Sequence, residues 1–417
     1  MQLVLYANQL IGLVFFLCYA YQMYYILVPF IKKEKKFYNA AEQNRFAVLI
    51  SARNEAAVIR PLIESIKAQT YDRELIDIFV VADNCTDDTA EIAESCGAHV
   101  YKRFDNINIG KGYALNYLLN EINKTYGDNY FDGYFVFDAD NVIDSHYIEE
   151  MNISFSNGYD ILTSYRNSKN YGDNWVSAGY GLWFLREAKY LNYSRMLCDS
   201  SCAISGTGYM FSRKVAKELG GWPYYLLTED IEFTIDRVID GYKIGFCKDA
   251  VFYDEQPTSF KQSIRQRMRW AKGYVQVIAN YGSKLLKGCK KGNFGCIDMT
   301  LNIMPAIFLT IFNMVINFTA FATGLIAGID VWPVVMCFTR GLCGLYGMLF
   351  AMGAITTVTE WNNIYTSNLK KIIYAFTFPL FMITYIPISI IAFFKKVEWK
   401  PIEHNEAKSL ADIKSVN

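Results

Sequence analysis

Two aspartates that stand one residue apart, Asp138 and Asp140, could hold a metal ion. They follow Tyr134–Phe137, a short apolar run that predicts a buried strand. Two carboxylates this close repel each other unless a cation lies between or beside them. Mg²⁺ and Mn²⁺ favour oxygen ligands and are bound by one or two carboxylates together with substrate phosphates. The pair therefore predicts a divalent-cation site for a diphosphate, with Asp140 as direct ligand and Asp138 contacting the nucleotide or the metal's surroundings.

Two further groups downstream complete a set that could transfer an activated sugar. Thr228-Glu229-Asp230 opens a predicted helix over 231–239, where a carboxylate is a candidate general base and also a common helix cap. Gln266, Arg269 and Trp270 stand at positions i, i+3 and i+4, so they share one helix face. That face offers a hydrogen-bond donor, a cation and an aromatic platform. Long apolar stretches flank the whole set, so we expect the chemistry beside a membrane.

In sequence order these groups resemble the motifs of the membrane-integrated, processive family 2 glycosyltransferases. That family includes the cellulose, hyaluronan, chitin and poly-N-acetylglucosamine synthases. The resemblance extends from about Phe46 to Trp270 and resumes near Trp399. It implies an α/β fold, a GT-A glycosyltransferase domain with a Rossmann-like, mostly parallel sheet, inserted between transmembrane helices. It also implies a UDP-sugar donor, with Mg²⁺ or Mn²⁺ as cofactor.

The resemblance assigns roles to single residues. Asp230 would take the proton from the acceptor hydroxyl as that oxygen attacks C1 of the sugar, which inverts C1 and gives a β-linked product. Glu229 would orient Asp230. Gln266 and Arg269 would help to hold the donor diphosphate, and Trp270 would stack on the acceptor sugar. The cation would stabilise the departing UDP as a Lewis acid.

The spacing of apolar runs independently predicts a mostly parallel α/β sheet, because short buried runs alternate with helical patterns. The predicted strands are Phe46–Ser51, Ile76–Ala82, His99–Lys102 and Tyr134–Phe137. In such sheets ligands bind beyond the carboxyl ends of the strands. Polar residues follow these strands at 51–55, 83 and 138–140, where we expect the donor site.

Further donor contacts are predicted near these strand ends. Arg53 and Glu55 belong to a segment that resembles the family's Pro-x-x-Asn-Glu strand end, although Ser51 stands where proline is usual. Asp83 would bond the uracil or ribose, or alternatively cap a helix near Thr89. Lys111 lies between two glycines at a helix start and would bind phosphate. Its alternative reading is a solvated loop lysine.

Two other segments resemble family features near the acceptor and the donor. Ser205–Tyr209 resembles the loop beneath the acceptor sugar, so Tyr209 would either stack on that sugar or be one of the chain's many core tyrosines. Trp399–His404 loosely resembles a Trp-x-x-Thr-x-His gating loop, with Ile402 in place of the hydroxyl residue. Trp399 and His404 are therefore predicted gating residues. The polar tail from Asn405 is expected to be disordered.

The membrane segments are predicted from apolar runs of about 20 residues, the length that crosses ~30 Å of hydrocarbon. They are Leu10–Ile31, Met299–Gly328, Val331–Val358 and Ile372–Phe394. Lys32-Lys33-Glu34-Lys35-Lys36 after the first predicts a cytosolic domain. Three later crossings would put Lys395-Lys396 outside, so either the charge rule fails or one segment is re-entrant or interfacial.

Polar residues inside these segments have two readings each. Arg340 either snorkels or pairs with a neighbour, or it lines a polar path for a polymer. Asn313 and Asn317 either line the same path or bond a neighbouring helix. Phe260–Lys272 alternates basic and apolar residues, which predicts an amphipathic helix on the membrane surface.

Composition limits the alternatives. A chain of 417 residues with 52% hydrophobic residues fits one soluble domain plus membrane helices. Zero net charge gives no reason to expect nucleic acid. Ten cysteines without a CxxC pair, and three dispersed histidines, favour reduced thiols over disulfides or zinc. We divide the chain into an N-terminal transmembrane helix (1–36), a GT-A domain (37–255), interface helices (256–298), a C-terminal transmembrane region (299–396) and a gating-like segment with a polar tail (397–417).

The resulting expectation is a processive, inverting β-glycosyltransferase of the plasma (inner) membrane with a cytosolic catalytic domain. It would polymerise UDP-glucose into a β-1,4- or mixed β-1,3/1,4-glucan, export the growing polysaccharide through the bilayer, and work with accessory membrane or cell-envelope subunits. The alternatives are a poly-N-acetylglucosamine synthase and a single-transfer enzyme acting on a membrane lipid. A silent channel or scaffold would require broken acidic motifs, and a transporter would leave the α/β domain unexplained.

Overall fold

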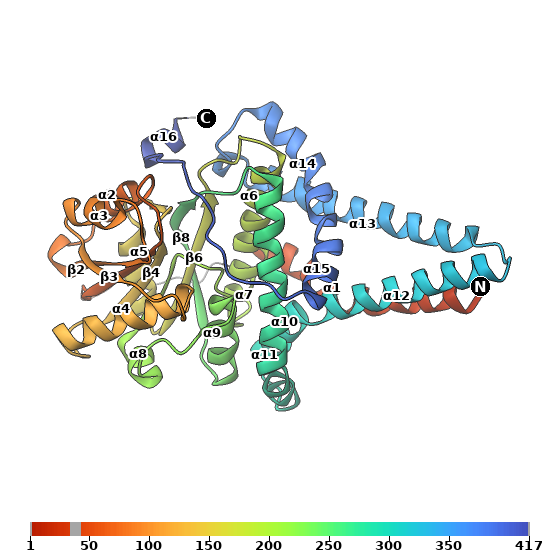
Figure 1. The fold of residues 1–417 in the computed structure, drawn as a ribbon, viewed down its shortest axis with the longest axis horizontal. Coiled ribbons are helices and arrows are strands. Elements are labelled where there is room, and N and C mark those ends of the chain that lie inside the picture. Colours follow the sequence, from red (N-terminus) through yellow and green to blue (C-terminus); the bar gives the residue numbers. More distant parts are fainter. Residues whose placement is uncertain (1, 34–42, 416–417) are drawn as a thin grey trace.

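A single sheet forms the centre of the larger half of the molecule in the computed structural model, which describes residues 2–33 and 43–415 (Figure 1). Within these residues the sheet has eight strands, in the order β3-β2-β1-β4-β7-β6-β8-β5. The strands are β1 (Phe46–Ala52), β2 (Ile76–Asp83), β3 (His99–Arg103), β4 (Gly133–Asp138), β5 (Val142–Ile143), β6 (Ile161–Ser168), β7 (Tyr209–Ser212) and β8 (Ile244–Asp254).

The sheet is mixed. Strands β3, β2, β1 and β4 run parallel, and β6 and β8 also pair in parallel, whereas β7 runs antiparallel to both β4 and β6. The parallel strands carry near-continuous apolar runs because helices cover both of their faces. The predicted α/β sheet is therefore confirmed. The apolar runs did not reveal the antiparallel pairings, which are those of β7 with β4 and β6 and of β5 with β8.

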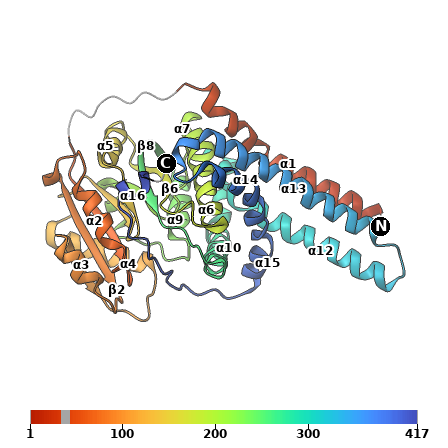
Figure 2. The ribbon, with the colours of Figure 1, turned by 90° about the horizontal axis from the view of Figure 1, so that it is seen from above.

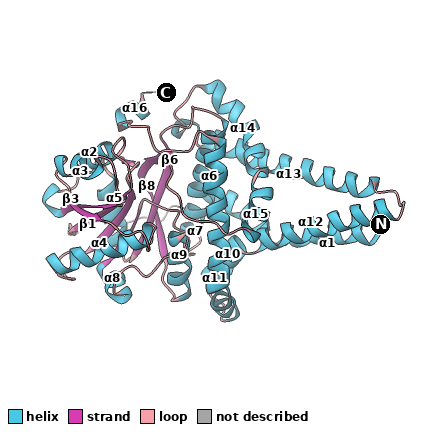
Figure 3. Ribbon diagram, viewed as in Figure 1, coloured by secondary structure: helices cyan, strands magenta, loops and turns pink. Residues whose placement is uncertain are grey.

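Helices lie against this sheet (Figure 3). They are α2 (Ile59–Lys67), α3 (Thr89–Ser95), α4 (Lys111–Tyr126), α5 (Tyr147–Ser156), α8 (Arg213–Leu219) and α9 (Glu229–Ile239). In α4, for example, Leu115, Leu118, Leu119 and Ile122 are all buried. This spacing places the four side chains on one face of α4, which packs on the sheet. The packing fixes the position of the first residue of the helix, Lys111, near the ends of the strands.

A second layer of helices separates the sheet from the membrane segments. It contains α6 (Trp175–Arg186), a π-helical turn η2 (Glu187–Asn192), α7 (Tyr193–Leu197), α10 (Phe260–Lys290) and α11 (Phe294–Ile303). The amphipathic helix predicted at Phe260–Lys272 forms the first part of α10. Arg267 was expected on the basic, exposed face of this helix, but its side chain is fully buried.

The long apolar helices are α1 (Gln2–Ile31), α12 (Pro305–Ile326), α13 (Trp332–Thr359), α14 (Asn368–Ile383) and α15 (Tyr385–Phe394). By length and composition, the described part of the chain holds four candidate membrane spans, and they overlap the four that the sequence predicts. α1, α12 and α13 extend from the same side of the sheet domain in both views (Figures 1 and 2).

Hydrogen bonds among three asparagines link two of these helices. Asn8 of α1 and Asn317 of α12 exchange amide hydrogen bonds of 2.8 and 2.7 Å, and Asn313 donates to Asn8 at 3.3 Å. Of the two interpretations of Asn313 and Asn317, the structure supports hydrogen bonding to a neighbouring helix. Arg340 lies exposed on α13.

The last apolar segment, α14–α15, begins and ends beside the sheet domain. At its start Lys370 donates to the carbonyl of Gly172 at 2.6 Å, and near its end the carbonyl of Phe393 accepts from Lys272 at 3.3 Å. Gly172 belongs to the sheet domain and Lys272 to α10, so both ends of the segment contact the part of the chain that carries the candidate site. The arrangement fits the re-entrant or interfacial alternative, and it leaves Lys395 on the same side as the sheet domain.

Residues 34–36, and with them the predicted boundary at 36/37, lie outside the described residues. The expectation of a disordered tail from Asn405 is wrong for residues 405–415, which include helix α16 (Leu410–Lys414). Ile413 is buried and Lys414 pairs with Asp144 at 2.6 Å, so the tail has both an apolar and an ionic anchor.

Candidate active site

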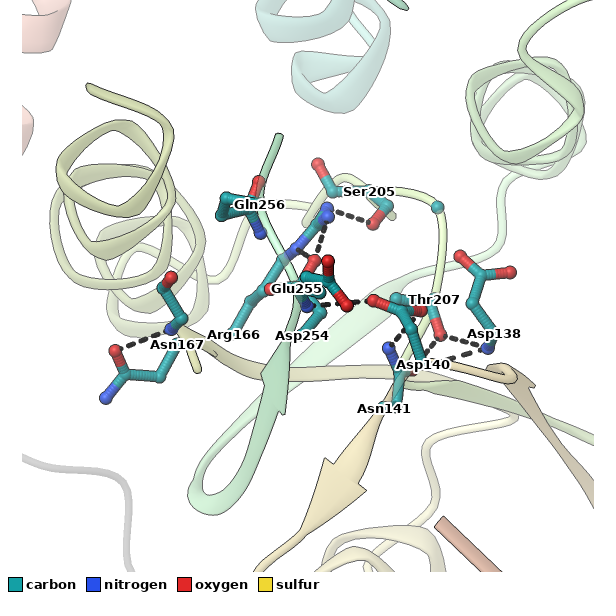
Figure 4. A network of polar contacts seen from close by, with 12 residues as sticks. Asp138, Asp140, Asn141, Arg166, Asn167, Ser205, Thr207, Asp254, Glu255 and Gln256 are labelled. Atoms are coloured by element: carbon teal, nitrogen blue, oxygen red, sulfur yellow. Dashed lines mark hydrogen bonds and ion pairs between the residues drawn. The ribbon is translucent and has the colours of Figure 1, made fainter. Parts of the chain in front are cut away.

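Polar side chains from several strand ends meet at one edge of the sheet (Figure 4). Asp138 ends β4, and Asp140 follows it in the turn before β5. Asp138 accepts a hydrogen bond from the Lys111 ammonium at 2.5 Å. Asp140 is buried and accepts from the backbone N–H of Glu255 at 2.8 Å. The two carboxylates thus have different surroundings, one beside a cation and one held by the loop after β8.

The donor set around these aspartates fits a divalent cation that takes most of its ligands from a diphosphate. Among the described residues, no three His, Cys, Asp or Glu side chains are arranged as a complete metal site. Mg²⁺ usually keeps only one or two protein carboxylates and completes its shell with phosphate oxygens and water. Asp138 and Asp140 satisfy that requirement, and a closed protein cage is not needed.

Lys111 joins the two acidic groups of the site. Its ammonium also donates to the carbonyl of Gly206 at 2.7 Å and lies 3.9 Å from Glu229. Burial alone would lower the pKa of Lys111, but Asp138 and Glu229 raise it overall, so the side chain stays charged. The alternative of a solvated loop lysine is wrong, because only 12% of its side chain is exposed.

Glu229 and Asp230 occupy the first turn of α9. Asp230 accepts from the N–H of Gly206 at 2.6 Å, so its carboxylate is bound to the loop before β7, and the N-cap residue of α9 is Thr228. Burial raises the pKa of Asp230. Burial, followed by the charge of Asp230, raises the pKa of Glu229 to about 7. A carboxylate whose pKa is shifted upward is suited to accept a proton near neutral pH.

The helix face predicted from Gln266, Arg269 and Trp270 points to this region. Arg269 donates to the carbonyl of Leu227 at 3.0 Å, just before the acidic pair on α9. The Gln266 side-chain oxygen is buried without a hydrogen-bond partner. Trp270 contacts Tyr180 edge-on, with ring centroids 5.6 Å apart. The face therefore brings a fixed cation, an unsatisfied amide and an aromatic ring to one side of the site.

The segment 399–406 packs against Arg53, Glu55 and Glu255, which follow β1 and β8. Trp399 stacks over Arg53, with 5.2 Å from the guanidinium carbon to the ring centroid, and His404 pairs with Glu55 at 3.0 Å. The backbone N–H groups of Asn405 and 406 donate to the carboxylate of Glu255. Burial would lower the pKa of His404, but the surrounding carboxylates raise it to about 10, so the ring is charged at neutral pH.

Two predicted residues are buried rather than open to a ligand in this structure. Asp83 is buried and bonds Arg103 at 2.5 Å, and it does not cap the helix near Thr89. Tyr209 is fully buried against Trp222, with ring centroids 6.2 Å apart. A ring without an open face cannot stack on a sugar, so the core reading of Tyr209 is the one that fits its position.

Several residues of the site were not predicted from the sequence. Arg166 on β6 bonds Asp254 at 2.8 Å and donates to the carbonyl of Ser205 at 3.0 Å (Figure 4). Asp254 and Glu255 follow the apolar run of β8, so the strand-end rule could have found them. Nothing in the pattern around Arg166 marks it, because its partners lie far along the chain.

Several buried polar atoms on the segments around this edge have no hydrogen-bond partner. They are Arg53 Nη1, Lys169 Nζ, Thr228 Oγ1, Asp254 Oδ1, Gln256 Nε2 and Gln266 Oε1. Buried polar groups nearly always have a hydrogen-bond partner, and a buried polar atom without one can mark the place of a ligand or ion. Their grouping supports a polar substrate at this end of the sheet.

Comparisons with known proteins agree with this geometry. A family model described as "Glycosyltransferase like family 2" matches residues 43–273. The probable glycosyltransferase YdaM of Bacillus subtilis is 26% identical over 273 residues, which is 60% of each chain. A beta-monoglucosyldiacylglycerol synthase of Synechocystis is 25% identical over 56% of this chain and 48% of its own. A poly-beta-1,6-N-acetyl-D-glucosamine synthase of Staphylococcus epidermidis is 24% identical over 55% and 54%.

A solved structure resembles the chain over nearly its whole length. The mannosyltransferase PcManGT of Pyrobaculum calidifontis, in complex with GDP-Man and Mn²⁺, aligns with a TM-score of 0.57 and 16% identity over 93% of this chain and 99% of that one. At this identity the likeness shows the fold alone. The chain spans about half to three fifths of the length of the curated relatives it matches.

Proposed function

The chain belongs to glycosyltransferase family 2 and has a GT-A-type fold with candidate membrane helices, and we propose that it transfers a hexose from a UDP-sugar to a hydroxyl at the membrane surface. One observation carries the proposal: a single buried lysine, Lys111, joins the strand-end aspartates to the acidic pair on α9. The expected position of the diphosphate, beside Asp138, is therefore linked through Lys111 to the acidic pair that contains the proposed base.

The donor binds at the carboxyl ends of β1, β2 and β4 in this proposal. Arg53 and Asp83 lie on the nucleotide side, and Lys111 and Arg269 flank the diphosphate. Asp138 and Asp140 would hold Mg²⁺ or Mn²⁺, which when bound neutralises the charge that develops on the departing UDP. Lys111 adds a fixed positive charge at the same place.

Asp230 acts as the general base. The acceptor oxygen forms a bond to C1, its proton passes to Asp230, and the bond from C1 to the diphosphate oxygen breaks, so UDP leaves with that electron pair. Attack from the face opposite the leaving group inverts C1 and gives a β-linked product from an α-linked donor. The hydrogen bond from Gly206 at 2.6 Å orients the Asp230 carboxylate for this step.

A lipid hydroxyl is the acceptor that we favour. Only 6% of the most apolar window of α1, and 12% of that in Phe294–Ile326, is buried, so the described helices present most of their surface outward. A polymer path through the bilayer needs helices that surround it. The curated relatives include a beta-monoglucosyldiacylglycerol synthase, which points to glucose and a diacylglycerol.

Polymer synthesis is the second candidate. It is favoured by Trp270, which offers an aromatic ring beside the acceptor position, and by the poly-N-acetylglucosamine synthase relative. A β-glucan or poly-N-acetylglucosamine product would need further membrane helices, from accessory subunits or from other copies. In both cases we propose a multi-pass protein of the plasma membrane with the catalytic domain cytosolic, because Lys32 and Lys395 lie on that side.

The test is transfer of labelled sugar by the purified protein in liposomes that contain diacylglycerol. UDP-glucose and UDP-N-acetylglucosamine are supplied separately with Mg²⁺ or Mn²⁺, and Asp230→Asn is the inactive variant. Asp236→Asn is the matched control, because Asp236 lies on the same helix but bonds Tyr224. Lipid-extractable label from one donor supports the favoured acceptor. High-molecular-weight product supports the second candidate, and no transfer to either class would overturn the proposal.

A further inference from the structure

A group of exposed lysines lies at the C-terminal end of α10, away from the candidate active site. We call it the α10 lysine cluster, and its members are Lys284, Lys287, Lys290 and Lys291. Within residues 2–33 and 43–415, none of the four ammonium groups forms an ion pair or a hydrogen bond. The exposed lysines of the sheet domain differ, because Lys102, Lys124, Lys214 and Lys217 each pair with an acidic side chain. The cluster therefore carries positive charge that no described residue neutralises.

The neighbouring chain supplies no counter-charge. No aspartate or glutamate lies between Glu255 and Asp298, a stretch that includes all of α10. Asp298 is buried, and both of its carboxylate oxygens accept from Arg195 at 2.9 Å. On α9, which packs against α10, Glu232 accepts a hydrogen bond from the Tyr281 hydroxyl at 3.1 Å. A surface with one sign of charge attracts a partner of the opposite sign.

The beginning of α12 places the cluster at the membrane surface. Met304, the residue before α12, lies beside Gly282, because a Cβ at Gly282 would be 4.0 Å from the Met304 methyl group. Gly282 comes just before Lys284, the first lysine of the cluster. α12 forms part of a candidate membrane span, and α10 runs across its direction in Figure 1. A helix in this position lies along the bilayer surface, where its side chains meet lipid headgroups.

The side chains at this end of α10 combine positive charge with exposed apolar surface. Lys284, Lys287 and Lys291 stand at positions i, i+3 and i+7, so they share one helix face. Leu286 is 45% exposed, and Phe294 at the start of α11 is 54% exposed. In helices bound to a bilayer surface, lysines meet anionic headgroups and apolar side chains enter the acyl boundary. A soluble polyanion would use the lysines alone, so the exposed apolar pair favours a bilayer as the partner.

We propose that the α10 lysine cluster binds the headgroups of anionic phospholipids and that this contact raises the rate of sugar transfer. α10 is one continuous helix over Phe260–Lys290, so its two ends move together. About 22 Å of helix separate Arg269, on the face toward the site, from Lys284. Headgroups that hold the cluster therefore also hold the face with Gln266 and Trp270 near the membrane, where a lipid acceptor is supplied. The effect on transfer rests on the proposed function, whereas the lipid contact does not.

The lipid contact is tested by acetylation of the whole protein in lipid nanodiscs, with the modified lysines located by mass spectrometry. The discs contain phosphatidylcholine alone or phosphatidylcholine with phosphatidylserine. Each lysine near an anionic surface gains about fivefold in binding, so the cluster should be acetylated at least about fivefold more slowly in the discs with phosphatidylserine. At about 1 M salt, where the screening length is about 3 Å, the difference should disappear. The matched controls are Lys102, Lys124, Lys214 and Lys217, whose rates should be the same in both discs.

The effect on transfer is tested with a variant that combines Lys284→Gln, Lys287→Gln, Lys290→Gln and Lys291→Gln. Initial rates of sugar transfer to dioleoylglycerol are measured in both kinds of nanodisc. Phosphatidylserine should raise the wild-type rate at least about fivefold, and the variant should keep the rate in phosphatidylcholine but lose the increase. A second variant, which removes the same charge elsewhere and should keep the increase, combines Lys102→Gln, Lys124→Gln, Lys214→Gln and Lys217→Gln.

Equal acetylation of the cluster in the two discs would overturn the lipid contact. Protection from acetylation by soluble heparin, without protection by phosphatidylserine, would overturn it in favour of a soluble polyanion. No increase in wild type, an unchanged increase in the cluster variant, or an equal loss in the second variant would overturn the effect on transfer. Absence of Asp230-dependent transfer in every disc, with the cluster still protected, would overturn the proposed function and leave the lipid contact supported.

Discussion

Replacing Lys111 by Met removes the ammonium that links Asp138 to Glu229. Its bonds to Asp138 at 2.5 Å and Gly206 at 2.7 Å are lost, and Glu229 loses a cation at 3.9 Å. Removing one partner of a fully buried ion pair costs about 3–5 kcal/mol, whereas an exposed pair contributes about 0–1 kcal/mol. Lys111 is 12% exposed but Asp138 is 38% exposed, so water partly solvates the remaining carboxylate and we expect a cost of about 2–3 kcal/mol. For a domain of this size each kcal/mol shifts Tm by about 2–4 °C, so we expect a loss of about 4–12 °C.

The assay is thermal unfolding in detergent, followed by intrinsic fluorescence, with Lys214→Met as the control. Lys214 makes an ion pair of similar length with Asp160, 3.0 Å, but its side chain is 61% exposed. An exposed pair contributes less than about 1 kcal/mol, so the control should lose less than about 4 °C. Equal losses for the two lysines would refute the argument that burial makes Lys111 the structural centre of the site. Added Mn²⁺ should restore part of the Lys111→Met loss and none of the control's.

Asp230→Asn should lower kcat by about 10²- to 10⁴-fold with donor KM unchanged, and wild-type activity should fall as pH drops through the raised pKa of Asp230, both read from initial rates of UDP release. Glu229 has a pKa raised to about 7, so its contribution to stability is present below the ordinary pKa of 4.5 and is lost as pH rises through 7; Glu229→Gln should therefore shrink the fall in Tm between pH 5 and pH 8. Ile413→Asp should free the tail and speed its limited proteolysis, whereas Lys414→Ala, which breaks a half-exposed pair, should change the cleavage rate little.

The parts of the site that could be predicted are those fixed by strand geometry. Asp138 follows an apolar run, and the carboxyl ends of parallel strands meet at one edge of a sheet, so its place near residues 53–55 followed from the pattern. The same rule, applied to β8, would have added Asp254 and Glu255. Helical spacing likewise placed Gln266, Arg269 and Trp270 on one face.

The remaining parts depend on contacts between distant segments. His404 and Glu55 are 349 residues apart, and neither has a periodic pattern that would predict their pairing. Glu187 is placed by a π-turn, and an extra residue in a helix leaves no mark in the apolar period. Tyr209 shows the opposite difficulty: it is one of 31 tyrosines, and its type alone does not separate a core ring from an exposed one.

The boundary predicted at 255/256 divides a unit that the structure joins. α10 carries Gln266, Arg269 and Trp270 to the site, while Arg267 on the same helix donates to the carbonyl of Phe381 at 3.0 Å and to the hydroxyl of Thr384 at 2.6 Å. These acceptors lie at the end of α14, where unpaired carbonyls and the helix dipole favour a cation.

α14 therefore fixes the rotation of α10, and through it the direction of the aromatic and cationic side chains. We expect Arg267→Met to lower transfer more than donor hydrolysis, because the acceptor side depends on this support while the strand-end donor site does not. Arg265→Met, which changes an exposed arginine two residues away, is the matched control. If both variants kept full transfer, α14 would have no part in shaping the site, and the sheet domain with α10 would suffice for the chemistry.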